Sequence, residues 1–223
     1  MVGPLPKMVD ERNESSSILA RWIGTYSPGS DEWHGLRKGR IGGSDIGTLL
    51  GWSPFSGRED LMLSKLGITG PKGMSPAMAR GNFLEDGVAQ WLAHKLGLGY
   101  DEERSKGTYL HDEYDWALFN PDRLTTCGRL VEIKTTNNRT VKYEWGEEGT
   151  NLVPLTYQAQ VQWGMGILGL TESFLGVLAG ALEGRPNLHF AYYVIPFEEQ
   201  VFEWELRQAK LFHEEYVERS QNG

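Results

Sequence analysis

Cysteine is almost absent from this chain of 223 residues, in which Cys127 is the only one. A single cysteine excludes a disulfide within the chain and a cysteine-rich zinc or iron–sulfur site, and it suits a reducing compartment. No apolar run approaches the length that spans a bilayer, and no N-terminal segment combines a basic start with an apolar core. The sequence therefore predicts a cytoplasmic protein that is neither secreted nor embedded in a membrane.

Basic residues are also scarce, because 22 Lys and Arg stand against 30 Asp and Glu, which gives a formal net charge of −8. Affinity for nucleic acid phosphates comes from Lys and Arg, so a protein that binds DNA with this balance must gather its cations in one channel. The five histidines show no metal-ligand spacing, which argues against zinc. Serine-hydrolase, nucleotide-triphosphatase and dinucleotide-binding motifs are missing too.

The length fits one domain over residues 1–223, in which the polar segment 1–16 is expected to form a loose N-terminal arm. Capping residues, Gly and Pro positions and the spacing of apolar residues predict the elements. Helices are expected at 31–36, from an N-cap at Ser44 to Gly51, from a capping box at 56–59 to Gly67, from Ser75 to Gly97, at 154–168 and at 197–219, and strands at 108–110, 116–119, 130–135, 172–178 and 189–195. We expect an α/β or α+β fold, in which a compact central mixed sheet is flanked by helices.

Two carboxylates and a lysine stand out in the middle of the chain, where Glu132 and Lys134 follow Asp122 after a turn at Gly128. In a strand, alternate side chains share a face, so Glu132 and Lys134 point one way while Ile133 points into the core. Mg²⁺ prefers oxygen ligands, so the two carboxylates and the Ile133 carbonyl can hold one, with Lys134 orienting water. The alternative is an exposed charged pair on a sheet, because so short a pattern recurs by chance.

Two helices carry further candidates. Glu85 follows Phe83 and Leu84, which are expected on the buried face of the helix that begins at Ser75, and a buried carboxylate needs a partner such as a metal or its water. The alternative is a solvent-facing Glu. Tyr157 and Gln160 share a helix face, and the Gln160 amide can serve an active-site carboxylate. The alternative there is a polar outer face.

The segment from Trp33 to Ser44 combines cations, a Gly42-Gly43 pair and a helix start. A helix start exposes backbone N–H groups, the glycines allow a phosphate to approach, and Arg37 can grip it with two hydrogen bonds. This is the best anion site in the sequence. The alternative is an ordinary surface Arg beside an ordinary N-cap.

Together these blocks resemble, in their order, the λ exonuclease and YqaJ viral recombinase family of PD-(D/E)XK nucleases, over about Trp33 to Leu168. The resemblance implies a Mg²⁺-dependent 5′→3′ exonuclease, with Mn²⁺ as a substitute, that resects double-stranded DNA ends for recombination by single-strand annealing. It further implies a ring-shaped trimer, a single-strand annealing partner, and a phage or prophage gene expressed in the cytoplasm of a bacterial host.

The resemblance also assigns roles to individual residues. Metal ligands would be Asp122, Glu132, the Ile133 carbonyl and Glu85; Lys134 and Gln160 would serve the attacking water; Arg37, Ser44 and Asn120 would hold the 5′-phosphate; Trp33, Arg40 and Tyr157 would flank the site. Two positions depart from the family pattern. Asn120 stands where a small hydroxyl residue is common, and Arg123 replaces a common Gly.

Other activities remain open on the same fold. A restriction-like or junction-cleaving endonuclease would use the same acidic and lysine residues. A Cas4-like exonuclease usually needs four cysteines for its iron–sulfur site, which Cys127 alone cannot supply. A non-catalytic subunit that binds DNA ends is the alternative from a different functional class.

Overall fold

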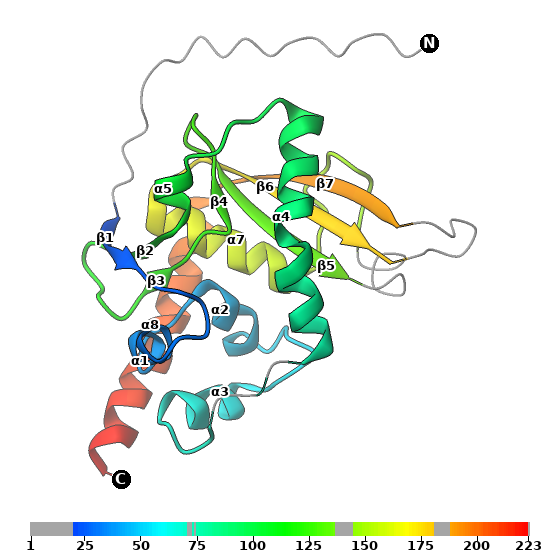
Figure 1. The fold of residues 1–223 in the computed structure, drawn as a ribbon. Coiled ribbons are helices and arrows are strands. Elements are labelled where there is room, and N and C mark those ends of the chain that lie inside the picture. Colours follow the sequence, from blue (N-terminus) through cyan, green and yellow to red (C-terminus); the bar gives the residue numbers. More distant parts are fainter. Residues whose placement is uncertain (1–19, 71–72, 74, 137–144, 181–187, 223) are drawn as a thin grey trace, which may run out of the picture.

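The computed structural model describes residues 20–70, 73, 75–136, 145–180 and 188–222, and Figure 1 shows its elements. The predicted arm at 1–16 lies outside the described residues. In chain order the elements are β1 (Arg21–Thr25), α1 (Asp31–Arg37), α2 (Gly43–Leu49), α3 (Arg58–Lys65), α4 (Pro76–Leu96), α5 (Glu102–Ser105), β2 (Gly107–Leu110), β3 (Leu118–Phe119), β4 (Arg123–Leu124), β5 (Leu130–Thr136), α7 (Leu155–Leu168), β6 (Glu172–Ala179), β7 (His189–Pro196) and α8 (Glu199–Asn222).

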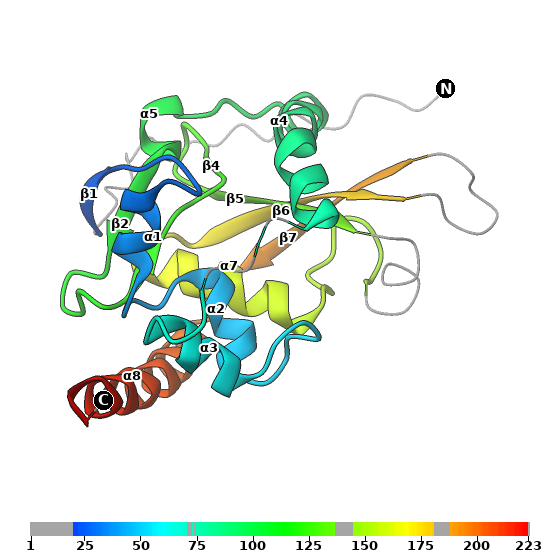
Figure 2. The same cartoon turned by 60° about the horizontal axis from the view of Figure 1, so that its bottom comes forward.

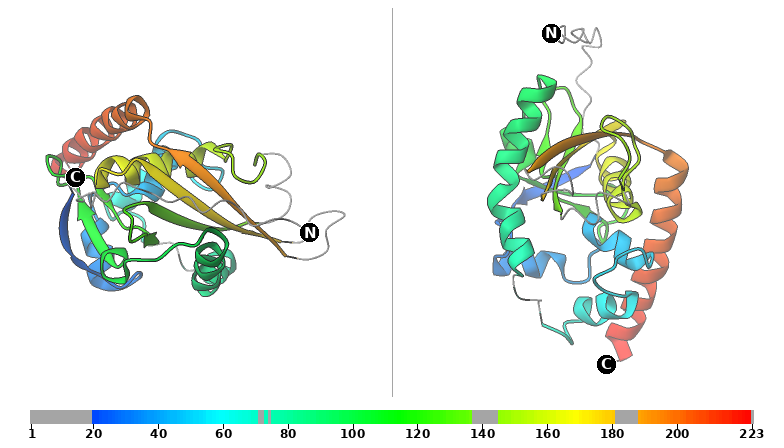
Figure 3. Two further views of the ribbon diagram at one scale, coloured as in Figure 1. Left: turned by 90° about the horizontal axis from the view of Figure 1, so that it is seen from above. Right: turned by 90° about the vertical axis from the view of Figure 1, so that its right-hand side faces the viewer.

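A mixed sheet with the order β4-β5-β6-β7 forms the centre. The pair β5 and β6 is parallel, with Glu132 opposite Leu175, and the other two pairs are antiparallel. Helix α4 covers one face of the sheet and α7 the other, with α8 outside α7 (Figure 3). The expected fold class, a mixed sheet flanked by helices, is confirmed.

One compact sheet was expected, but the strands divide into two. β2 and β3 join β1 in a separate antiparallel sheet with the order β1-β2-β3. Pro121 follows β3 and has no N–H to donate to a ladder, so the chain leaves this sheet there and enters the central one at β4. The short crossing between the two sheets carries Asp122. The strand β1, which completes the second sheet, was not predicted.

Two helix starts differ from the prediction by one or two residues. Gly42, and not Ser44, is the N-cap of α2, because the Asp45 carboxylate accepts a hydrogen bond from the Gly42 N–H at 2.8 Å. Helix α3 begins one residue later than predicted, because Gly57, and not Ser56, is its N-cap, with an aspartate three residues later. An acidic side chain at the third helical position reaches back to the N-cap N–H, and that contact fixes the start in both helices.

Helix α4 begins and ends where the sequence predicts, at Ser75 and at Gly97, which takes a left-handed conformation with φ +67°. The side of α4 that is buried differs from the side that the sequence predicts. Val88 and Leu92 pack against β5 and β6, whereas Phe83, expected on the buried face, is 87% exposed. The first half of α4 is therefore mostly exposed, although a β-carbon on Gly81 would already lie 3.5 Å from Thr135 Oγ1 of β5, and Glu85 follows one turn later.

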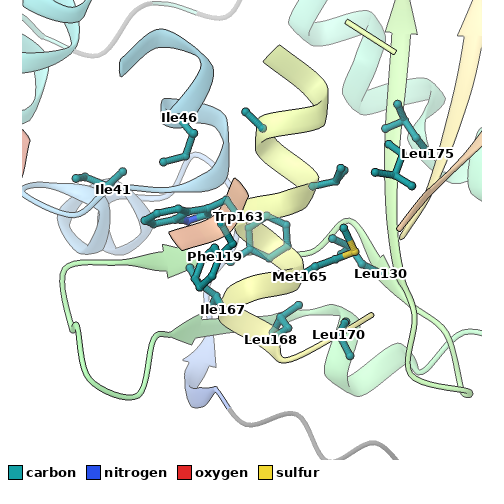
Figure 4. Packing of buried hydrophobic residues seen from close by; sticks show 14 of the residues in the cluster. Ile41, Ile46, Phe119, Leu130, Trp163, Met165, Ile167, Leu168, Leu170 and Leu175 are labelled. Atoms are coloured by element: carbon teal, nitrogen blue, oxygen red, sulfur yellow. The ribbon is translucent and has the colours of Figure 1, made fainter. Parts of the chain in front are cut away.

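The main core lies between α7 and the two sheets (Figure 4). Trp163 of α7 donates its indole N–H to the Leu118 carbonyl at 3.0 Å. Gly164 lets α7 approach closely, since a β-carbon there would lie 2.3 Å from Phe119 Cζ. Helix α2 in turn contacts α7, α3 and α8 (Figure 2). These contacts hold α2 and β5 against the same helix, α7.

Candidate active site

Glu132 is the most deeply buried carboxylate of the site, at 1% exposure on β5. Its Oε1 accepts hydrogen bonds from Lys134 Nζ at 2.6 Å and from Gln160 Nε2 of α7. The predicted alternation is confirmed, because Leu130 belongs to the core beneath α7 while Val131 and Ile133 pack beneath α4. The interpretation as an exposed charged pair is wrong. The second oxygen, Oε2, is buried and has no hydrogen-bond partner among the described residues.

Asp122 lies at the open edge of β5. Its Oδ2 accepts a hydrogen bond from the Ile133 N–H at 2.7 Å, in the place where a strand partner would otherwise bond. β4 pairs with β5 only through Arg123 and Leu124, opposite Val131 and Leu130, so no described strand pairs with this edge at Glu132 and Ile133. The N–H and C=O of one strand residue point to the same side, so the Ile133 carbonyl also faces the Asp122 edge.

The electrostatics of this cluster favour an added cation. Burial, followed by the negative charge of Asp122, raises the pKa of Glu132 to about 8, although Lys134 opposes the shift. Burial opposes the ionised form of Lys134, yet the charges of Glu132 and Asp122 outweigh it and raise the pKa of the ammonium. One ammonium therefore does not neutralise the two carboxylates, and a divalent cation at the bare Glu132 Oε2 would relieve the excess negative charge.

The donor set fits a hard divalent cation. Asp122, Glu132 Oε2 and the Ile133 carbonyl offer oxygen ligands on one edge, which is the ligand type that Mg²⁺ and Mn²⁺ take. Within the described part of the chain, no three His, Cys, Asp or Glu side chains converge on one point. Glu85, expected as a further ligand, is therefore not gathered with the other two carboxylates.

Glu85 is instead held by Arg123. The Arg123 Nη1 donates to Glu85 Oε1 at 2.8 Å, and Nη2 donates to Asp86 Oδ1. Burial and then the charge of Asp122 raise the pKa of Glu85. The partner that the sequence required for this carboxylate is thus an arginine 38 residues away, a pairing that no spacing in the sequence could indicate.

Tyr157 completes the surroundings of the lysine. Lys134 Nζ lies 5.6 Å from the centre of the Tyr157 ring, and that ring packs against Trp145. The predicted shared face of Tyr157 and Gln160 is confirmed, because both reach the Glu132–Lys134 pair. Gln162 points elsewhere and is fully buried, where its amide bonds the backbone between β7 and α8.

The second half of the site gathers around Arg37. Its Nη2 donates to Ser44 Oγ at 3.0 Å and lies 3.6 Å from Asp45 Oδ2, while the guanidinium stacks 4.7 Å over the Trp33 ring. A β-carbon on Gly42 would lie 2.6 Å from Arg37 Nη2, so this glycine makes room for the guanidinium itself. Two of the predicted phosphate-binding residues, Arg37 and Ser44, thus lie together with Trp33, which was expected to flank the site.

Lys65 of α3 belongs to this pocket, and sequence reasoning missed it. Its Nζ is buried and donates to Asp45 Oδ2 at 2.7 Å and to the Arg37 carbonyl at 3.3 Å. Burial opposes the ionised form of Asp45, but the charges of Lys65 and Arg37 outweigh it and lower its pKa. Two basic side chains thus surround one carboxylate, although burial, assisted by the charge of Arg37, lowers the pKa of Lys65. A lysine in the last turn of a helix gives no signal that it is buried.

Asn120, a predicted phosphate contact, and Arg40, expected to flank the site, both have partners within the protein. Arg40 donates to the backbone carbonyls of Asp115 and Leu36, both at 2.9 Å, and so ties α1 to the loop before β3. Asn120 Nδ2 donates to Thr108 Oγ1 at 2.6 Å, which leaves Asn120 Oδ1 buried without a partner among the described residues. Asn120 thus lies in the segment between β3 and β4 that also contains Asp122, while Arg40 stabilises the end of α1 through its hydrogen bonds.

Gly43 joins the two halves of the site. A β-carbon there would lie 2.7 Å from Phe119 Cε2 and 3.2 Å from Gln160 Cγ. Gln160 bonds Glu132, and Gly43 precedes Ser44, so one packed contact connects the carboxylate cluster to the Arg37 pocket. The arrangement offers cation ligands at one end and an anion pocket at the other.

Residues 32–172 match the model of the YqaJ-like viral recombinase domain, which is more than half of the chain. The chain belongs to this family. It is 34% identical over 154 residues to the uncharacterized protein YqaJ of Bacillus subtilis, which covers 67% of the chain and 46% of that protein. It is 26% identical over 165 residues to protein D345L of African swine fever virus, with 62% and 45% covered. The chain thus spans about half the length of these curated relatives.

Solved structures show the same fold. The alkaline exonuclease LHK-Exo from Laribacter hongkongensis matches with a TM-score of 0.68 at 18% identity, over 86% of this chain and 95% of that one. A phage-related exonuclease from Haemophilus somnus matches with a TM-score of 0.55 at 10% identity, over 84% and 99%. No helix in the described residues is long and apolar enough to cross a membrane.

Proposed function

We propose that this chain is a Mg²⁺-dependent deoxyribonuclease, with Mn²⁺ as a substitute, that degrades double-stranded DNA from its 5′ ends during recombination. The observation that supports it best is the bare Glu132 Oε2, buried at the same edge as Asp122 and beside Lys134. Burying an unpaired carboxylate oxygen costs free energy, and a ligand that needs that oxygen explains why it is left free.

Each residue has a distinct part in the proposed chemistry. Asp122, Glu132 and the Ile133 carbonyl would hold the divalent cation, which when bound lowers the pKa of water and stabilises charge on the scissile phosphate. Lys134 is fixed between Glu132 and the Tyr157 ring, so its ammonium is positioned to orient the attacking water. Gln160 holds Glu132 Oε1 and leaves Oε2 free for the cation.

The pocket of Arg37, Ser44 and Trp33 supports the proposed polarity. A terminal 5′-phosphate fits the guanidinium and hydroxyl, which already lie 3.0 Å apart. Lys65 neutralises Asp45 and so leaves the Arg37 charge available. Successive cuts would then proceed from the anchored 5′ end, in the 5′→3′ direction.

The proposal includes assembly as a ring-shaped trimer and cooperation with a single-strand annealing protein. We propose that the protein is expressed from a phage or prophage gene and acts in the bacterial cytoplasm. The net charge of −8 fits a ring whose cations face an inner channel. Mass in solution tests the trimer directly, and a monomer that cuts DNA internally would contradict both the ring and the dependence on ends.

The experiment is digestion of a blunt 5′-phosphorylated duplex with and without Mg²⁺, beside a closed circular duplex. We expect digestion of the linear substrate only, and only with the metal. Lys134→Ala should abolish it, whereas Lys210→Ala, at an exposed position on α8, should not. A Lys134→Ala protein as active as the unmodified chain would refute the assignment. Cleavage of the circle would indicate an endonuclease, and duplex binding without metal-dependent turnover would indicate a non-catalytic subunit.

A further inference from the structure

Arg123 lies between the carboxylates of α4 and the backbone of Asp122. Its Nη1 donates both to Glu85 Oε1, at 2.8 Å, and to the Asp122 carbonyl, while Nη2 donates to Asp86 Oδ1. The side chain is 18% exposed, although arginine is usually an exposed residue. Three acceptors from two elements therefore fix the guanidinium in one place.

That place lies near two like charges. The negative charge of Asp122 acts on Glu85, and both charges act on Arg123. Two neighbouring carboxylates offer oxygen ligands to a divalent cation. Arg123 instead engages one Glu85 oxygen with a hydrogen bond and holds the backbone carbonyl of Asp122 with the same nitrogen.

The charges of the site lead to the same conclusion. When ionised, Glu85, Asp86, Asp122 and Glu132 carry four negative charges around this part of the site, and Arg123 and Lys134 carry two positive ones. One divalent cation offsets the remaining two negative charges. A second would leave the site strongly positive and would have to displace a guanidinium that has three acceptors.

We propose that Arg123 takes the place of a second divalent cation, so that the site binds one metal ion, through Asp122, Glu132 and the Ile133 carbonyl. Glu85 is then a positioning residue, which holds Arg123, and not a metal ligand. This inference rests on the proposed function and specifies its metal requirement. It also gives a role to the arginine that replaces glycine in the family pattern.

The test counts bound Mn²⁺ per chain by electron paramagnetic resonance of the free ion, without DNA. We expect one Mn²⁺ for the unmodified protein and two for Arg123→Ala and for Arg123→Gln, the second of which keeps most of the side-chain volume. The matched control is Arg207→Ala, at an exposed arginine of α8, which should keep one. Circular dichroism identifies variants that do not fold, and either neutral variant suffices for the test.

Two bound ions in the unmodified protein, or one in both folded Arg123 variants, would overturn the inference. No bound Mn²⁺ in the unmodified protein would overturn it together with the proposed metal dependence. The nuclease proposal fails separately, if the expected stoichiometries are found but no duplex is digested. The count of ions therefore distinguishes failure of the one-metal inference from failure of the activity.

Discussion

Gln160 packs directly against Gly43, with its Cγ placed 3.2 Å from where a β-carbon on that glycine would lie. The same Gln160 side chain donates to Glu132. The contact therefore sets the distance between the carboxylate cluster on β5 and the Arg37 pocket beside α2. Position 43 therefore requires a glycine because any side chain would collide with its packing neighbours, and not only because a glycine lets a phosphate approach.

Gly43→Ala should displace Gln160 or α2, because the added methyl group would also meet the Phe119 ring at 2.7 Å. Overpacking of this kind costs about 1–3 kcal/mol of stability. We expect DNA digestion to slow by roughly tenfold to a hundredfold, as for other small misplacements of reacting groups. Single-turnover digestion measures it, with Gly35→Ala as the control, since a β-carbon on Gly35 meets nothing within 4 Å. Equal rates for the two variants would contradict the coupling.

Lys65→Met should weaken the preference for 5′-phosphorylated ends. Without Lys65, the Asp45 carboxylate has only Arg37 as a cationic partner and should draw the guanidinium away from Ser44. The ratio of digestion rates on 5′-phosphate and 5′-hydroxyl duplexes should fall roughly tenfold, as expected for the loss of one charge-assisted hydrogen bond of about 1.5 kcal/mol.

This ratio does not depend on how much of the variant is folded, which matters because breaking a buried ion pair costs about 3–5 kcal/mol. Lys210→Met on the exposed face of α8 is the control. An unchanged ratio in Lys65→Met would show that Lys65 supports the fold without adjusting the pocket.

The parts of the site that could be predicted depend on local periodicity. Strand alternation places Glu132 and Lys134 on one face, and helical spacing places Tyr157 and Gln160 together, so both pairs follow from the sequence. Gly97 likewise ends α4 through its left-handed conformation. In each case the feature depends on residues that are only a few positions apart in the sequence.

The parts that could not be predicted depend on contacts between distant segments. Arg123 meets Glu85 across 38 residues, and Lys65 meets Asp45 across 20. Both involve charged side chains that are usually exposed, so composition and spacing give no sign of their burial. The division into two sheets has the same cause, since it depends on the pairing of β1 with β2, far along the chain.

Glu205 on α8 makes stability depend on pH. It is fully buried, neither carboxylate oxygen has a partner among the described residues, and burial raises its pKa to about 9 from an ordinary 4.5. Below about pH 4.5 the folded and unfolded chains both keep the proton. Between these values only the unfolded chain releases it, so the free energy of unfolding should fall as the pH rises toward 9.

Glu205→Met should remove this fall and raise stability above neutral pH, because Met is apolar and of similar volume. Urea unfolding at several pH values measures the effect, with the exposed Glu218→Met on the same helix as the control. A Glu205→Met protein whose stability changes with pH as steeply as that of the control would contradict the assignment of a buried, protonated Glu205.

Glu132→Gln should separate metal binding from folding. The amide keeps the shape of the side chain and can still bond Gln160, but it cannot act as an anionic ligand at Oε2. Mn²⁺ should raise the thermal unfolding temperature of the unmodified protein, because a ligand that binds only the folded state stabilises it by mass action. The variant should show no such rise, while Glu218→Gln should respond like the unmodified protein. A Glu132→Gln protein that Mn²⁺ stabilises as strongly as the unmodified protein would show that the cation binds elsewhere.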